Sequence, residues 1–145
     1  MSRTPWGRVL GAACAGAMLL AAGCGRSSPD RGSVSGEVTL DGKPLEQGGI
    51  LFVPIEGTKG TVAGGQIVDG KYALSGEDGP AVGTNRVEIR AQKKTGKMEQ
   101  KPLAPPGVMV ERMVEAVPPR FNSASTLKTE IEPGENQADF QVESK

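Results

Sequence analysis

The chain contains no histidine among its 145 residues. Histidine is the commonest general acid–base group and a leading metal ligand. Its absence therefore reduces the number of catalytic mechanisms and metal sites that the chain could support. Aromatic residues are also scarce, with one tryptophan, one tyrosine and three phenylalanines. Trp6, the single tryptophan, lies in an N-terminal segment that we expect to be removed. Together with the lack of recognisable motifs described below, this composition leads us to expect no catalytic residue, no metal site and no cofactor.

Cysteine is equally rare, and both copies, Cys14 and Cys24, lie near the N-terminus. The first eight residues carry Arg3 and Arg8 and no acid, and an apolar run of about 14 residues follows. That run is shorter than the roughly 20 residues that span a bilayer. A basic start, a short apolar run and small residues at its end are typical of a secretory signal peptide, here residues 1–23.

The sequence "AAGC", residues 21–24, resembles the lipobox of bacterial lipoproteins. The resemblance implies cleavage between Gly23 and Cys24, lipid on the Cys24 sulfur and anchoring to a membrane through two or three acyl chains. A single chain would bind only marginally. Ala21 stands where the lipobox favours leucine. A secreted protein cleaved nearby, or an uncleaved anchor, is the alternative.

Residues 24–33 are polar and are predicted to form a flexible tether. Gly25 occupies the position where lipoprotein sorting often has a retention aspartate, so the resemblance favours the outer membrane if the cell has one. With Cys14 in the signal peptide and Cys24 lipidated, no thiol is left for a disulfide, although the exported compartment would permit one.

Charge argues against nucleic acid as a partner. Without residues 1–23 the chain has 15 basic and 17 acidic side chains, which is not the charge balance of a nucleic-acid-binding domain. The densest basic cluster comprises Lys93, Lys94, Lys97 and Lys101. We expect it to be a solvated loop. A contact with anionic lipid or polymer is the alternative.

Apolar residues in the remaining chain alternate with polar ones, and glycine turns separate the segments. Val34 and Val38 share one face of a first strand, and Val87 and Ile89 share one face of a later strand. Asp-Gly pairs at 41–42 and 69–70 predict tight turns, since such turns need positive φ. About seven short strands at regular spacing predict an all-β fold, a β-sandwich over residues 34–143.

Several turn motifs resemble the carboxypeptidase regulatory-like domain, which has a transthyretin-like (prealbumin-like) fold. The resemblance rests on segments 36–38 (Gly-x-Val), 41–45 (Asp-Gly-x-Pro-Leu), Gly49, 69–72 (Asp-Gly-x-Tyr) and Gly83. Asn85 stands near a position where the family often has tyrosine. The C-terminal segment from Val117 further resembles small bacterial lipoproteins built on this domain. The resemblance implies a folding, spacing or adhesive module without catalysis.

Residues 92–122 interrupt the strand pattern and form an insertion. The first half is polar and broken by prolines, which predicts a loop. Apolar residues then recur at helical spacing, which predicts a short helix or an irregular flap over an edge of the sandwich. The apolar residues are Met109, Val110, Met113, Val114 and Val117. We expect them to pack onto the sandwich, and a binding lip for a partner is the alternative.

Other motifs are weaker. Ser125-x-x-Lys128 and Lys94-Thr95-Gly96 match two penicillin-binding signatures, but their order is reversed and the middle element is missing, so we interpret both as coincidence. The acids that could suggest calcium binding are scattered and form no calcium-binding loop. These acids are Asp41, Asp69, Glu77, Asp78 and Asp139. We interpret the "GEDGP" segment, which contains two of them, as a turn.

Two aromatic residues bear on ligand binding. Sugar-binding sites commonly present exposed aromatic faces, and Tyr72 is the single candidate. Phe121, in "PPRFN", is expected to insert into the core, with a contact surface as the alternative.

Taken together, these features of the sequence lead us to expect a lipid-anchored, non-enzymatic envelope module with a structural or protein-interaction role and an unidentified protein partner. A periplasmic or surface module that binds a glycan or small solute is the alternative.

Overall fold

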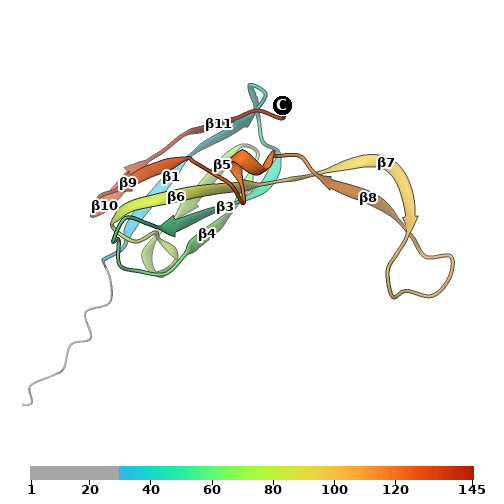
Figure 1. Ribbon diagram of the computed structural model, residues 1–145, viewed down its shortest axis with the longest axis horizontal. Helices are drawn as coiled ribbons and strands as arrows, with labels where there is room; N and C mark the ends of the chain where they lie inside the picture. Colours follow the sequence, from blue (N-terminus) through green and yellow to red (C-terminus); the bar gives the residue numbers. More distant parts are fainter. Residues whose placement is uncertain (1–29) are drawn as a thin grey trace, which may run out of the picture.

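The computed structural model describes residues 30–145, and within them the chain is all-β, as predicted (Figure 1). It has eleven strands and two single-turn 3₁₀ helices. Their bounds, in chain order, are β1 (Gly32–Leu40), β2 (Lys43–Pro44), β3 (Gln47–Pro54), β4 (Ala63–Val68), β5 (Lys71–Leu74), η1 (Gly76–Asp78), β6 (Gly83–Arg90), β7 (Gln92–Gln100), β8 (Met109–Glu115), η2 (Pro119–Phe121), β9 (Lys128–Ile131), β10 (Gly134–Gln137) and β11 (Phe140–Val142).

Nine strands form one curled sheet, which we call the body. Its order is β10-β1-β5-β4-β3-β6-β9, and β2 and β11 also pair with β1. The two C-terminal strands run parallel to β1, whereas the other neighbours in the body are antiparallel. The C-terminal segment thus lies beside the first strand, so parts of the chain that are distant in sequence pair within the body.

The core is built from inward-facing residues, which alternate with outward-facing ones along the strands of the body. Val34, Val38, Val87 and Ile89 are buried, as the period-two pattern predicts. Phe52, Tyr72 and Phe140 pack together with ring centroids 6.0–6.5 Å apart. Most of the chain's few aromatic side chains therefore serve packing at the centre of the body.

Both Asp-Gly turns form where the sequence predicts them. Asp41 and Gly42 have φ of 52° and 78°, and Asp69 and Gly70 have φ of 51° and 78°. These left-handed pairs match the twist of the adjacent strands, which is why the Asp-Gly sequence is favoured there. Asn85, where the family pattern has tyrosine, is fully buried and donates hydrogen bonds to the carbonyls of Ala81 (2.8 Å) and Gly83 (2.9 Å).

The structure corrects most of the prediction for the insertion. β7 and β8 form an antiparallel hairpin where a loop and a short helix were expected, and the loop prediction is confirmed only for the connecting residues 101–108. The apolar residues of β8 fit a helical spacing and also a strand, because short apolar runs carry both periods. Valine's branched side chain favours the strand, and β7 supplies the backbone partners. The structure has eleven strands where about seven were predicted. The four additional strands are β7, β8, the short β2, and one that arises because the last predicted strand is divided into β10 and β11.

The hairpin also does not cover an edge of the body. It projects away from the curled sheet, and we call residues 92–115 the arm (Figure 1). Only after it does the chain return to the body, where Ala116 and Val117 are buried.

Candidate interaction surface: the β7–β8 arm

Exposed apolar side chains concentrate on the arm. Seven large hydrophobic residues are exposed among residues 30–145, and two of them, Val62 and Val68, belong to the body. The other five lie between positions 98 and 113: Met98, Leu103, Val108, Met109 and Met113. Scattered single exposures need no explanation, but a cluster on one projecting element marks a binding surface.

A bulge sets which side chains share a face of the arm. The pairing runs Lys94 with Met113 and then Met98 with Glu111, so β7 has two more residues than β8 between these pairs. Three side-chain-mediated hydrogen bonds hold the bulge: Thr95 Oγ1 to the Arg112 carbonyl (3.0 Å), Gly96 N–H to Glu111 Oε1 (3.1 Å) and Lys97 N–H to Thr95 Oγ1 (3.3 Å).

Three methionines lie on one face as a result. Met109 and Met113 alternate with Val110 and Arg112 along β8, and Met98 faces Glu111 on the same side as both. We call Met98, Met109 and Met113 the methionine face. Methionine is unbranched and polarizable, so an exposed set of methionines suits a surface that adapts to its partner.

The arm and the body differ in charge. Residues 92–115 carry five basic and three acidic side chains, whereas the other described residues carry nine basic and fourteen acidic ones. Two of the arm's acids pair within the arm: Glu111 lies 3.6 Å from the Lys94 ammonium, and Glu99 lies 3.9 Å from Arg112. The arm is therefore a cationic projection from an acidic body.

The third acid, Glu115, fixes the root of the arm. Its Oε1 accepts hydrogen bonds from the N–H groups of Ala91 (2.9 Å) and Val117 (3.3 Å). The Ala116 N–H donates to the Ala91 carbonyl at 2.7 Å. The chain thus leaves and re-enters the body at two adjacent points tied by backbone and carboxylate hydrogen bonds.

A groove of about 480 Å³ lies between this root and the turn that contains β2. Its apolar lining includes Leu45, Ala91 and Met113. Its charged lining comprises three lysines and one acid, which leaves a net positive charge: Lys43, Lys93, Lys94 and Glu46. Since Met113 belongs to both, the groove continues the methionine face toward the body. An apolar surface with cationic lining fits a partner that presents apolar side chains beside carboxylates.

The aromatic residues considered for ligand binding are used in packing. Tyr72 is 4% exposed, and its hydroxyl donates to the Ala138 carbonyl at 2.6 Å. Burial, with a smaller effect of the Asp139 charge, raises the pKa of Tyr72 well above its usual value. Phe121 is partly buried against the core, with the Arg120 guanidinium 4.7 Å from its ring centroid. Tyr72 therefore offers no face to a sugar.

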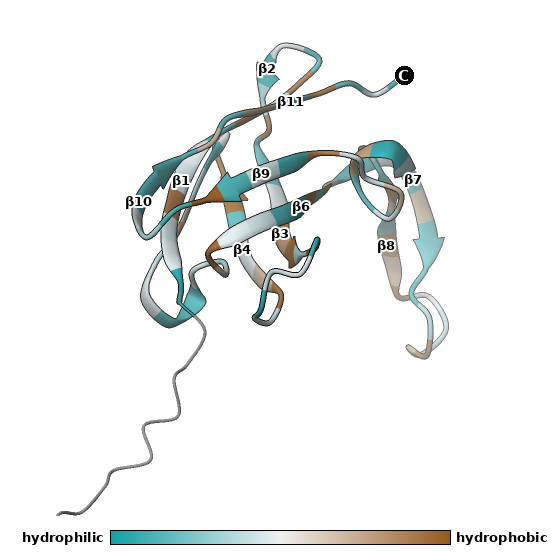
Figure 2. Ribbon diagram, turned by 60° about the vertical axis from the view of Figure 1, so that its left-hand side comes forward, coloured by the Kyte–Doolittle hydropathy of each residue, from teal (hydrophilic) through white to brown (hydrophobic). Residues whose placement is uncertain are grey.

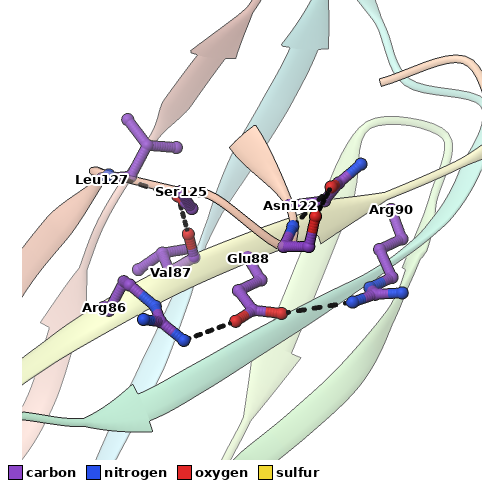
Figure 3. Close-up of polar contacts among 8 residues, drawn as sticks. Arg86, Val87, Glu88, Arg90, Asn122, Ser125 and Leu127 are labelled. Atoms are coloured by element: carbon purple, nitrogen blue, oxygen red, sulfur yellow. Dashed lines mark hydrogen bonds and ion pairs between the residues drawn. The ribbon is translucent and has the colours of Figure 1, made fainter. Parts of the chain in front are cut away.

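Ser125 and its neighbours also serve the fold (Figure 3). The Ser125 hydroxyl donates to the Val87 carbonyl and accepts from the Leu127 N–H at 3.2 Å, and Lys128 pairs with Glu56. Ser125 lies three residues before β9. Lys94 belongs to the arm and pairs with Glu111. Each group of the two penicillin-binding signatures thus has a structural partner of its own.

Figure 3 also shows a charged row on β6 that the sequence analysis missed. Glu88 is largely buried, and its carboxylate lies 2.7 Å from Arg86 and 3.5 Å from Arg90. The Arg-x-Glu-x-Arg spacing was the available signal, because residues two apart on a strand share a face. The two guanidinium groups compensate a carboxylate that would be costly to bury alone.

The acids that were weighed as calcium ligands remain dispersed. Asp41 accepts a hydrogen bond from the Ser144 N–H at 2.9 Å, which holds the pKa of that carboxyl below its usual value. Asp139 accepts from the Glu37 N–H at 2.7 Å. No group of three or more acidic, cysteine or histidine side chains in residues 30–145 is placed to hold a metal ion.

Within residues 30–145, no helix has the length and apolar character needed to cross a membrane. Comparison of the chain with protein-family models, with curated proteins and with solved structures finds no match. The predicted cleavage and lipidation site, Gly23 and Cys24, lies outside the described residues.

Proposed function

We propose that this chain is a lipid-anchored, non-enzymatic module of the bacterial cell envelope, which binds a partner protein through the methionine face and the groove at the arm's root. The observation that carries the proposal is the concentration of exposed apolar side chains on a cationic arm whose strands bury no side chain of their own. The body supplies a rigid base, and the arm supplies the contact.

The fold type belongs to the same proposal. We assign the body to the prealbumin-like β-sandwiches and the chain to lipoproteins with a carboxypeptidase regulatory-like domain. The curled all-β sheet and the two left-handed Asp-Gly turns support this assignment, since the turns are the motifs on which the resemblance rests. Domains of this kind act beside other proteins, which agrees with a binding arm.

The envelope location rests on the N-terminal sequence. The basic start, the short apolar run and the lipobox-like "AAGC" support export and acylation at Cys24, with the outer membrane favoured if the cell has one. The mass of the N-terminal peptide of protein extracted from membranes tests this step. A peptide that begins at acylated Cys24 is expected, and an unmodified start elsewhere would contradict the anchor.

Site-specific photo-crosslinking tests the binding surface. A photoreactive side chain in place of Met113 is expected to give one dominant adduct in the intact producing cell. The matched control replaces Val68, which is also exposed but lies on the body. Equal adducts from both positions, or none from position 113, would refute the arm as the contact surface.

A further inference from the structure

The outermost segment of the arm, residues 101–108, has properties that the methionine face does not share, and we call it the tip. Its sequence is "KPLAPPGV". We propose that the tip inserts into the headgroup–acyl interface of an anionic lipid membrane and so provides a second membrane contact beside the N-terminal lipid. The proposal rests on the lipid-anchored location given above.

The tip leaves almost no backbone donor for water. Its three prolines have no N–H. The N–H groups of Lys101, Ala104 and Val108 bond to carbonyls of the tip, and the Gly107 N–H bonds to Gln100 Oε1 at 3.1 Å. Of the tip's N–H groups, only that of Leu103 has no acceptor within residues 30–145. Unpaired backbone groups are the main cost of entering lipid, so pairing of the donors lowers the cost of contact with the interface.

Leu103 is the apolar group that would enter. It is fully exposed, with φ of 60°, a left-handed conformation that is strained for a residue with a side chain. A glycine would avoid that strain, and a polar residue would avoid the exposure. Val108 and Met109, where the chain returns from the tip to β8, are exposed as well. A strained, exposed leucine at the end of a projecting hairpin presents its side chain outward.

Cations flank this apolar end. The ammonium groups of Lys97 and Lys101 form no ion pair within residues 30–145, whereas nearby Glu99 is paired with Arg112. A lysine near an anionic surface is worth about 1 kcal/mol of binding. This arrangement matches the interface of an anionic bilayer. The apolar side chains would contact the lipid acyl chains, and the lysines just behind them would contact the negative headgroups.

The arrangement of the body agrees with this contact. In Figures 1 and 2, which differ by a turn about the vertical axis, the tip and the start of β1 both lie toward the lower side, and the C-terminus lies toward the upper side. The chain from Cys24 to Asp30 can extend roughly 20 Å. A membrane reached by lipid on Cys24 can therefore lie on the side that the tip faces.

Fluorescence of a tryptophan at the tip tests the proposal. The full chain with Trp6→Phe and Leu103→Trp is reconstituted in vesicles of phosphatidylcholine and phosphatidylglycerol that contain brominated lipid. We expect a blue shift and strong quenching at position 103. The matched control, Trp6→Phe with Val68→Trp, places the probe at an exposed site on the body, and we expect it to be unquenched.

Charge variants sharpen the test. Lys97→Gln and Lys101→Gln are each expected to lower the inserted-to-free ratio of the tip by about fivefold, the equivalent of about 1 kcal/mol. Lys59→Gln and Lys71→Gln make the same charge change on the body and are expected to leave the ratio unchanged. Quenching that is identical in vesicles of pure phosphatidylcholine would overturn the electrostatic part.

Two outcomes overturn the insertion itself. Equal quenching of the probes at positions 103 and 68 would show that the tip has no preferred contact with lipid. A blue shift without quenching by brominated lipid would place the tip against protein. Either result with an acylated Cys24 would leave the anchor intact, whereas quenching at position 103 with Cys24 unmodified would refute the anchor and keep the insertion.

Discussion

The body and the arm are built from the same element, the antiparallel strand pair, and are stabilised differently. In the body, β3 and β6 bury Ile50, Phe52, Val87 and Ile89 completely. In the arm, neither β7 nor β8 contains a buried residue. The arm depends on its backbone ladder, on the bulge and on the Gln100 amide, which donates to the Pro105 carbonyl (2.9 Å) and accepts from Gly107.

The difference shows which part of the chain sets stability and which is available for contact. Burial of apolar surface is the dominant favourable contribution to folding, and the body contains nearly all of it. A two-stranded hairpin is marginally stable at best without a packed face. The arm therefore contributes little to the free energy of unfolding, and its side chains are free to vary with a partner.

The largest effect is expected from Phe52→Ala in the body. Removing a fully buried ring from the aromatic trio lowers the free energy of unfolding by about 3–5 kcal/mol. Met98→Ala, an exposed residue of the arm, is expected to change it by less than about 0.5 kcal/mol. Urea denaturation measures both. If Phe52→Ala does not fold, Ile67→Val, expected to cost about 0.5–1.5 kcal/mol, replaces it.

The next effect concerns a close approach of two chain segments. A Cβ on Gly36 would lie 1.9 Å from the Ala138 carbonyl oxygen, whereas a Cβ on Gly49 would have only an ordinary contact at 3.8 Å. Gly36→Ala is expected to lower stability by about 1–3 kcal/mol, because the backbone between β10 and β11 must shift. Gly49→Ala is the control. Equal thermal shifts for the two variants would contradict this account.

A smaller effect depends on pH. Tyr72→Phe removes a hydrogen bond to the Ala138 carbonyl and is expected to cost about 1 kcal/mol. Because burial raises the Tyr72 pKa in the folded state, the neutral phenol is favoured there. That contribution is constant below the unfolded pKa of about 10 and is lost as pH rises above it. Wild-type stability should therefore fall more steeply above pH 10 than that of Tyr72→Phe, as measured by denaturation at several pH values.

The smallest change in stability is expected from the largest change in sequence. Replacing residues 93–114 with Asn-Gly keeps the Gln92–Glu115 pair and closes it with a favoured hairpin turn. We expect the free energy of unfolding to change by about 1 kcal/mol or less, since no fully buried residue is removed. The crosslink from position 113 and lipid quenching at the tip disappear with the segment. A loss of several kcal/mol would show that the arm is part of the core.

Much of the body follows from the sequence. Period-two alternation identified the buried faces of β1 and β6, and the Asp-Gly pairs identified two turns, because both depend on local chemistry. The arm was misjudged, since its apolar residues satisfy a helical and an extended spacing equally well. Only the pairing of β8 with β7, a non-local interaction, decides between them.

The candidate site was only partly predictable. The lysine cluster was evident from the sequence, but we expected a solvated loop there, and it lies on β7 and at the tip. The methionine face was missed, because Met98 joins Met109 and Met113 only through a bulge of two extra residues. A bulge of this kind depends on Thr95 and Glu111 side chains that bond to backbone, which composition and periodicity do not reveal.

The root of the arm has a consequence for evolution. The chain leaves the body at Ala91 and returns at Ala116, two positions joined by one short backbone hydrogen bond. Insertions and deletions are tolerated where a segment starts and ends at neighbouring points outside the core. Hairpins of other lengths and sequences can therefore be exchanged at this junction while the body is inherited unchanged. Selection for a new partner would act on about two dozen residues, independently of selection for stability.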